Sequence, residues 1–187
     1  MKLISLWEPW ATLMAIGAKR IETRSWSTRY RGWLAIHASK GGLGKIELAS
    51  TLEELEFAEA LEGHTLSPGC IVAVVKLAEC IPTHELWTQQ KCPKCEGKGT
   101  YIGWLDGMPG GLECMNCSGG YVFVLGGKLP RQEQAFGNYE EGRYGWITTD
   151  LFRLPHPLPY RAKQGLVELD EPTIVELRKQ WKRANGS

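Results

Sequence analysis

Short apolar segments with period-two alternation recur along the chain and predict β-strands. Within Gly32–Ala38, alternation places Trp33 and His37 on one face of the strand, and Leu34 and Ile36 on the opposite face. The segment 70–77 is apolar enough to be a central strand. Further strands or extended segments are predicted over 1–7, 19–24, 144–148, 154–159 and 165–169.

Helical spacing of apolar residues predicts three helices. Trp10, Leu13 and Met14 share one face of a helix over 9–16, which Gly17 ends. Two more helices are expected over 45–61 and 172–182, and 125–136 is interpreted as a linker or an edge strand. This order of elements lacks the regular strand–helix alternation of a parallel α/β fold. We therefore predict an α+β fold in which a mixed sheet closes on itself and carries helices at its periphery.

The composition of the 187 residues is that of a globular protein, and its net charge of +1 gives no overall attraction to nucleic acid or membrane. A site for a polyanion must therefore be a local patch. The sequence contains no run of 18 apolar residues and no signal-peptide pattern. We expect an intracellular, cytoplasmic protein with no membrane partner, built as a single domain over 1–187 with a small insert at 91–120.

Four of the six cysteines form two CxxC pairs inside this insert, namely Cys92 with Cys95 and Cys114 with Cys117. Each pair can point two thiolates at one ion, and two pairs at this separation complete a tetrahedral zinc site. A site closed by four cysteines has no open position for a substrate. The spacing therefore predicts one structural Zn²⁺.

Glycine-rich sequences follow both pairs, CEGKG at 95–99 and CSGG at 117–120. They resemble the zinc knuckles of the DnaJ cysteine-rich region, which has four such repeats where this chain has two. The resemblance implies zinc and no chaperone activity. Two interpretations of the insert stay open: a loop that the metal stabilises, or a nucleic-acid contact through Lys91, Lys94, Lys98, Tyr101 and Trp104.

Several other residues are interpreted as packing residues. Trp7 and Trp33 supply large apolar area and are predicted to fill the core. Cys70 and Cys80 lie in or beside the most apolar strand and are predicted to be buried. His37 is interpreted as a structural or simply exposed strand residue.

A charged cluster follows the first predicted helix. In an extended 19–24 segment, alternation places Arg20, Glu22 and Arg24 on one face, where Glu22 can hold two guanidinium groups. Trp10 and Trp26 flank this cluster. Indole rings beside fixed cations form a surface that can stack a nucleobase and bind its phosphate.

The same residues form a pattern that resembles the ASCH domain, a family named after activating signal cointegrator. The pattern consists of PWA at 9–11, GxKxxExRxW at 17–26 and RGxLxIHA at 31–38. The segments GCIVAVV at 69–75 and GRYGW at 142–146 also resemble that family. The resemblance covers most of the chain outside the cysteine insert.

This resemblance implies a PUA-like fold, a small pseudo-barrel of mixed strands with flanking helices. It also implies a cleft that binds RNA or another single-stranded nucleic acid. In this prediction the cations Lys19, Arg24 and Arg31 contact phosphate or a polar base edge, and Glu22 orients Arg24 or accepts from a base amino group. The residues carried over to the cleft are Pro9, Trp10, Lys19, Glu22, Arg24, Trp26, Arg31, Arg143 and Tyr144.

Two other functions remain open. A small bacterial group that resembles this chain at the Gly-x-Lys turn hydrolyses N4-acetylcytidine with a threonine three residues after the lysine. This chain has Glu22 at that position, and Thr23 is expected to face the other way. A hydrolase acting on RNA or a modified nucleoside, with Lys19 and Glu22 as acid and base, is therefore the second prediction. The third is an interaction module whose zinc insert binds a protein partner.

Overall fold

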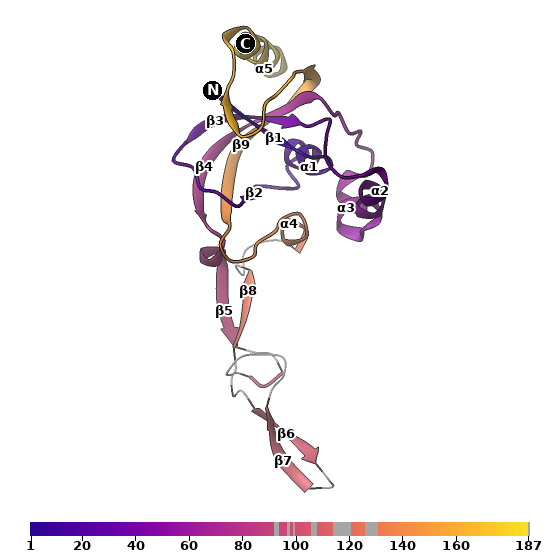
Figure 1. The fold of residues 1–187 in the computed structure, drawn as a ribbon, viewed down its shortest axis with the longest axis vertical. Helices are drawn as coiled ribbons and strands as arrows, with labels where there is room; N and C mark the ends of the chain where they lie inside the picture. Colours follow the sequence, from indigo (N-terminus) through magenta and orange to yellow (C-terminus); the bar gives the residue numbers. More distant parts are fainter. Residues whose placement is uncertain are drawn as a thin grey trace.

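The protein is described in a computed structural model, which covers residues 1–91, 94–96, 98, 100–105, 108–113, 121–125 and 131–186. A six-stranded mixed sheet forms its body, with the strand order β10-β1-β3-β4-β9-β2 (Figure 1). β1 and β3 are parallel, and every other neighbouring pair of this sheet is antiparallel. The strands are β1 (Lys2–Leu6), β2 (Ile21–Arg24), β3 (Gly32–Ala38), β4 (Cys70–Pro82), β9 (Tyr144–Pro159) and β10 (Leu166–Glu168).

The sheet is curled, and one helix packs on each of its two faces. On the inner face, Met14 of α1 (Trp10–Ile16) packs in one cluster with Leu34 and Ile36 of β3. On the outer face, Leu177 of α5 (Glu171–Asn185) packs in a second cluster with Ala35. β3 therefore alternates between two cores as predicted, and each fully buried Leu or Ile stabilises the fold by about 1.5–3 kcal/mol. The expected α+β fold with a mixed sheet that curls on itself is confirmed.

The helix predictions are correct at the ends of the chain and need correction in the middle. α1 ends at Gly17, whose φ of 81° suits glycine, and α5 begins where the Asp170 side chain accepts from Thr173 N at 2.8 Å. The single helix expected over 45–61 is two helices, α2 (Lys45–Glu53) and α3 (Leu55–Leu61), because Glu54 is extended. This break lets α3 bury Phe57, whereas α2 has no buried residue.

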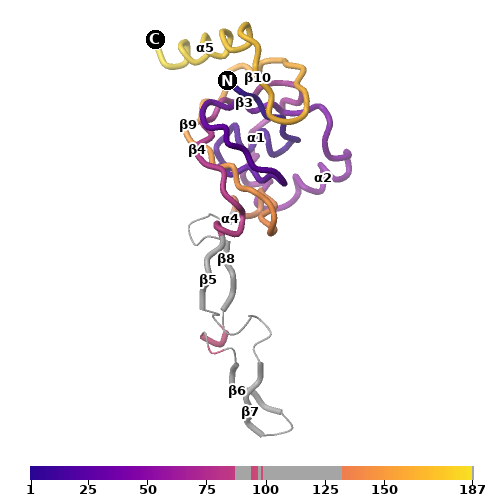
Figure 2. Tube along the Cα trace, turned by 60° about the vertical axis from the view of Figure 1, so that its left-hand side comes forward, coloured from indigo at the N-terminus to yellow at the C-terminus, as the bar shows by residue number. Residues whose placement is uncertain are grey.

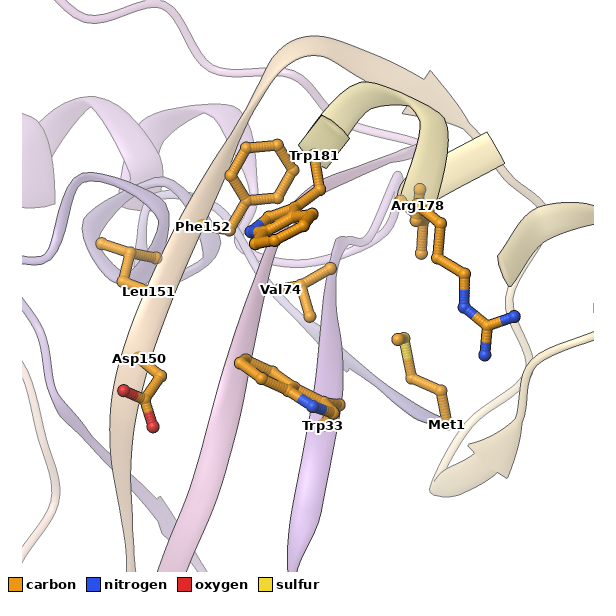
Figure 3. A pocket seen from close by; sticks show the side chains of 9 residues that line it. Met1, Trp33, Val74, Asp150, Leu151, Phe152, Arg178 and Trp181 are labelled. Carbon is orange, nitrogen blue, oxygen red and sulfur yellow. The ribbon is translucent and has the colours of Figure 1, made fainter. Parts of the chain in front are cut away.

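Two further predictions were wrong. The segment expected to be a linker or edge strand holds a helix, α4 (Arg131–Ala135), after which Phe136 packs on Phe57 with ring centroids 4.8 Å apart. Trp7 and Trp33 do not fill the core but are 53% and 47% exposed. Trp7 lies just beyond the end of β1, and Trp33 lies on the outer face of β3 beside a cavity (Figure 3).

The remaining packing predictions have mixed outcomes. His37 is buried, and its ring nitrogens lie 3.0 Å from Ser5 Oγ and 3.1 Å from Tyr160 O, which makes it a structural residue. Cys70 and Cys80 are only partly buried and pack against the edge of the inner core. The Cys80 sulfur also accepts from Thr28 N at 3.4 Å.

Two separate strand pairs follow the short 3-10 helix η1 (Thr83–Leu86). β5 (Trp87–Lys91) pairs with β8 (Tyr121–Leu125), and β6 (Thr100–Leu105) pairs with β7 (Met108–Glu113). Three of the predicted zinc ligands, Cys92, Cys114 and Cys117, lie outside the described residues.

Within the described part of the chain, no helix is long and apolar enough to cross a bilayer. Figure 2 shows α5 at the end of the six-stranded body where the N-terminus and β10 lie.

Candidate nucleic-acid interface

A cleft opens where the curl of the sheet brings the end of β1 close to the edge strand β2, and the line between these two strands is here called the seam. β10 pairs with β1 only as far as Ile4, so the carbonyl of Ser5 is available on that edge. Arg24 of β2 donates to it from Nη2 at 2.9 Å and thereby bridges the seam. The cleft, here called the seam cleft, has a volume of about 550 Å³. It is lined by Ser5, Leu6, Trp7, Trp10, Glu22, Thr23, Arg24, Ala135, Phe136, Gly137, Asn138 and Arg143.

Two arginines and one glutamate are the charged groups of this lining. Glu22 Oε1 lies 3.0 Å from Arg24 Nε, an ion pair whose angle is outside hydrogen-bond geometry. Arg143 is half-buried and donates to Thr23 O and to Asn138 O, both at 3.2 Å. Both guanidinium groups are therefore fixed by backbone carbonyls at the wall of the cleft, which reduces the entropy lost when they bind a ligand.

Lys19 does not line the seam cleft but lies behind it, with 1% of its surface exposed. Its ammonium nitrogen donates to Ile21 O at 2.6 Å and to Phe136 O at 2.7 Å, and it lies 3.6 Å from Glu22 Oε2. Burial lowers the pKa of Lys19, and the nearby charges of Glu22 and Glu133 oppose that shift. The structure thus places Lys19 as a brace between β2 and the segment after α4.

Glu133 is another buried charge of this region, and it was not among the predicted site residues. Its carboxylate accepts from Arg20 N at 2.6 Å and from Ile21 N at 2.9 Å, so it ties α4 to the start of β2. The Tyr139 hydroxyl lies 3.3 Å from Glu133 Oε1. Burial, reinforced by the Glu133 charge, raises the pKa of Tyr139. No spacing pattern in the sequence links Glu133 to β2, because the contact spans more than a hundred residues.

The structure brings together only part of the predicted site. Trp10, Glu22, Arg24 and Arg143 all line the seam cleft, and Pro9 is buried beside it as the residue that precedes α1. Glu22 was predicted to hold the guanidinium groups of both Arg20 and Arg24, and this is wrong for Arg20, which turns away and donates from Nε to Gly17 O at 3.1 Å. The Glu22 carboxylate lies instead between Arg24 and Lys19.

The other predicted residues lie outside the cleft lining. Trp26 packs edge-to-face on the buried Trp146, with ring centroids 4.7 Å apart. The Arg31 guanidinium donates to the carbonyls of Thr28 and Tyr30 at 2.9 and 2.8 Å. Tyr144 pairs opposite Arg24 in the β2–β9 ladder.

Trp7 takes the place on the cleft wall that the sequence analysis gave to Trp26. It is more exposed than Trp10, which packs edge-to-face on Phe57 at 6.1 Å. Glycine at position 42 lets the chain approach the Trp7 ring, because a Cβ on residue 42 would lie 3.1 Å from Trp7 Cγ. The clue to Trp7 in the sequence was that it directly follows a strand and directly precedes Glu8-Pro9.

A second cavity, of about 470 Å³, lies between α5 and the outer face of the sheet and shares no lining residue with the seam cleft. Figure 3 shows Trp33 and Trp181 on opposite sides of it, with Val74 between them. Its only charged lining side chains in the described chain are those of Asp150 and Arg178. This mostly apolar cavity lacks the paired arginines expected of a polyanion site.

Comparison with known proteins agrees with the pattern of residues around the seam cleft. A family profile of the ASCH domain matches residues 4–139. The chain belongs to the ASCH domain family. This match includes every residue of the seam cleft except Arg143, and it confirms the PUA-like fold expected from the sequence.

Two proteins named activating signal cointegrator 1 are similar to part of this ASCH chain. The human protein is 35% identical over 81 residues, which is 42% of this chain and 14% of that protein. The mouse protein is 30% identical over 89 residues, which is 46% of this chain and 15% of that protein. The chain therefore spans only a small fraction of the length of these relatives.

Proposed function

We propose that this ASCH domain binds single-stranded nucleic acid, and RNA in particular, in the seam cleft. The observation that carries the proposal is the presence of two fixed arginines, Arg24 and Arg143, in one cleft with two tryptophans, Trp7 and Trp10. Proteins that bind single strands combine cations for the backbone with aromatic rings on which bases stack. Membership in a family linked to nucleic-acid binding supports the same function.

In this proposal the arginines bind phosphate, and the tryptophans stack bases. Glu22 fixes Arg24 and offers its remaining lone pairs to a base amino group. Lys19 acts as a positioning residue, because its ammonium group is occupied by two carbonyls and Glu22. This assignment replaces the phosphate contact that the sequence had suggested for Lys19.

Fluorescence-quenching titration with short single-stranded RNA and DNA over a series of salt concentrations tests the proposal. Arg143→Gln removes one phosphate contact, so the slope of log K against log salt should fall by about 0.7. Arg178→Gln removes the same charge beside the apolar cavity and is the matched control. Equal slopes for Arg143→Gln and the wild type would refute the role of this cleft.

A second candidate function is hydrolysis of a bound nucleotide or modified nucleoside. The observation that favours it is the position of Glu22, which lines the cleft while its carboxylate lies 3.6 Å from the buried Lys19 amine. Burial that lowers a lysine pKa is one way in which enzymes prepare an acid–base group. The wild type should then release product and Glu22→Gln should not, whereas a pure binding domain yields no product with either protein.

The zinc prediction continues as a proposal for the insert. Cys95 is the predicted ligand that lies within the described residues, and it is 3% exposed. It lies in a turn in which the Cys95 carbonyl accepts from Lys98 N at 2.9 Å. The two strand pairs hold the ends of both cysteine segments together, because Lys91 pairs with Tyr121 and Thr100 with Glu113. This arrangement fits a tetrathiolate that holds one Zn²⁺ through Cys92, Cys95, Cys114 and Cys117 and orders the insert.

Metal analysis of the purified protein should find one zinc per chain, and Cys95→Ser should lower that content.

Binding of a protein partner through the insert stays an alternative function. It predicts that deletion of 91–120 abolishes capture of the partner and leaves nucleic-acid affinity unchanged. Among the described residues, none of 91–120 belongs to the two apolar clusters that pack on the six-stranded sheet, so the deletion should leave the body folded.

A further inference from the structure

A polar pocket of about 540 Å³ lies at the ends of β3 and β9, next to the seam cleft. Lys40 and Arg161, both exposed, are cationic lining residues, and the described lining includes no Asp or Glu. The Lys40 stem crosses Gly69, which has a φ of 83° and no side chain, and a Cβ at that position would overlap Lys40 Cε. The missing side chain at Gly69 thus leaves room for the Lys40 stem along this pocket.

The end of the β1–β3 ladder is the common wall of this pocket and the seam cleft. Ser5 and Leu6 line the seam cleft. His37, which pairs with Ser5 in the ladder, and Ser39, which follows the end of β3, line the polar pocket. Ser39 N donates to Leu6 O at 2.7 Å. These bonds place the two hollows on adjoining sides of one rigid pair of strand ends.

A hydrogen-bonded histidine makes this wall rigid. Because Tyr160 O can only accept, His37 Nε2 donates to it and Nδ1 accepts from the Ser5 hydroxyl. Burial lowers the pKa of His37, which favours this neutral tautomer. The positive charge of the polar pocket therefore comes from Lys40 and Arg161.

The surface that joins the two hollows is exposed and carries an aromatic ring. Trp7 lines the seam cleft on one side, and Gly42 of the loop that contains Lys40 lies against the same indole. Arg24 and Arg143 thus lie before Trp7, and Lys40 and Arg161 lie beyond it. Alternation of cations with a stacking surface is what a single strand requires as it passes from one phosphate to the next.

We propose that a nucleic-acid strand bound in the seam cleft continues across Trp7 into the polar pocket, where Lys40 and Arg161 bind its next phosphates. This inference rests on the proposed function of the seam cleft. It adds a second phosphate subsite and a direction for the strand, from the seam between β1 and β2 toward the ends of β3 and β9. Asp170, whose carboxylate accepts from the Tyr160 hydroxyl at 3.3 Å, marks the far limit of the positive surface.

The test compares a dinucleotide with an octanucleotide, both of uridine, on the full chain. The double variant Lys40→Gln/Arg161→Gln should bind the dinucleotide as the wild type does and lose most of the extra affinity for the octanucleotide. Its salt slope for the octanucleotide should fall by about 1.4, the sum for two phosphate contacts. Lys182→Gln/Arg183→Gln, in the last turn of α5, removes equal charge and should keep the wild-type slope.

The outcomes separate the two proposals. An octanucleotide slope that is unchanged in Lys40→Gln/Arg161→Gln, with dinucleotide binding still sensitive to Arg143→Gln, overturns the second subsite and leaves the seam cleft intact. Equal slope losses in the Lys182→Gln/Arg183→Gln control also overturn it, because the effect is then one of overall charge. Failure of the wild type to bind either oligonucleotide overturns the proposed function itself. Thermal unfolding of both variants checks that these exposed substitutions leave the fold intact.

Discussion

Replacing Lys19 by methionine distinguishes a structural brace from a phosphate ligand. Methionine keeps most of the volume of the lysine stem but removes the ammonium group. The carbonyls of Ile21 and Phe136 then lose a donor, and Glu22 loses one of its two cationic neighbours. The substitution therefore affects β2 and the segment after α4 together.

The expected cost follows from the number of groups left without partners. A buried acceptor that loses its partner costs about 1–3 kcal/mol, and removal of one member of a buried ion pair costs about 3–5 kcal/mol. These two energy costs describe overlapping losses, so we expect Lys19→Met to lower the free energy of unfolding by about 3–5 kcal/mol. Lys76→Met is the control, because Lys76 is 52% exposed in a 3.8 Å pair with Asp150 and should cost about 0–1 kcal/mol.

Urea unfolding monitored by tryptophan fluorescence measures this difference. The double variant Lys19→Met/Glu22→Gln should cost less than the sum of its single variants, because no carboxylate is then left unpaired. A loss below about 1 kcal/mol for Lys19→Met, together with additivity in the double variant, would refute the brace. If such a stable variant also lost affinity for RNA, Lys19 would be a ligand-binding residue after all.

Three other predictions follow from the described contacts. Trp7→Ala should weaken binding of a single strand by about 1–3 kcal/mol in a fluorescence titration, and Trp181→Ala, at similar exposure, should have no effect. The pKa of Tyr139 is raised above its ordinary value of 10.0, so the folded state loses stability as pH rises past that value; Tyr139→Phe should remove this loss in urea titrations at alkaline pH. Burial lowers the pKa of His37 from 6.5, so stability should fall as the pH drops below that value, and His37→Gln should make this fall smaller in urea titrations.

The sequence predicted the six-stranded body well because its signals are local. Alternation in β3, the apolar run in β4 and the glycine that ends α1 each depend on neighbouring residues. The same local signals were misleading at α4, where a short helix is stabilised by Glu133 and by Phe136 packing on Phe57. Such contacts between residues far apart in the sequence leave no periodic pattern.

The candidate site shows the same division. The GxKxxExR pattern located β2 and the Glu22–Arg24 pair, but it did not show which side chains face a cleft. Lys19 looked exposed because lysine usually is, and only the carbonyls contributed by a distant segment explain its burial. Trp7, which was expected in the core, is 53% exposed and lines the cleft. Trp26, which was expected in the cleft, packs on Trp146 and keeps 38% of its surface exposed outside the cleft lining.

Photo-crosslinking tests most directly whether the seam cleft holds a single strand. An oligoribonucleotide that carries 5-iodouridine would be irradiated with the protein, and the crosslinked peptide identified by mass spectrometry. A strand bound in the seam cleft should give crosslinks to Trp7 or Trp10, which are lost when unlabelled RNA competes. Crosslinks confined to Trp33 or Trp181, or to peptides of the insert, would contradict it.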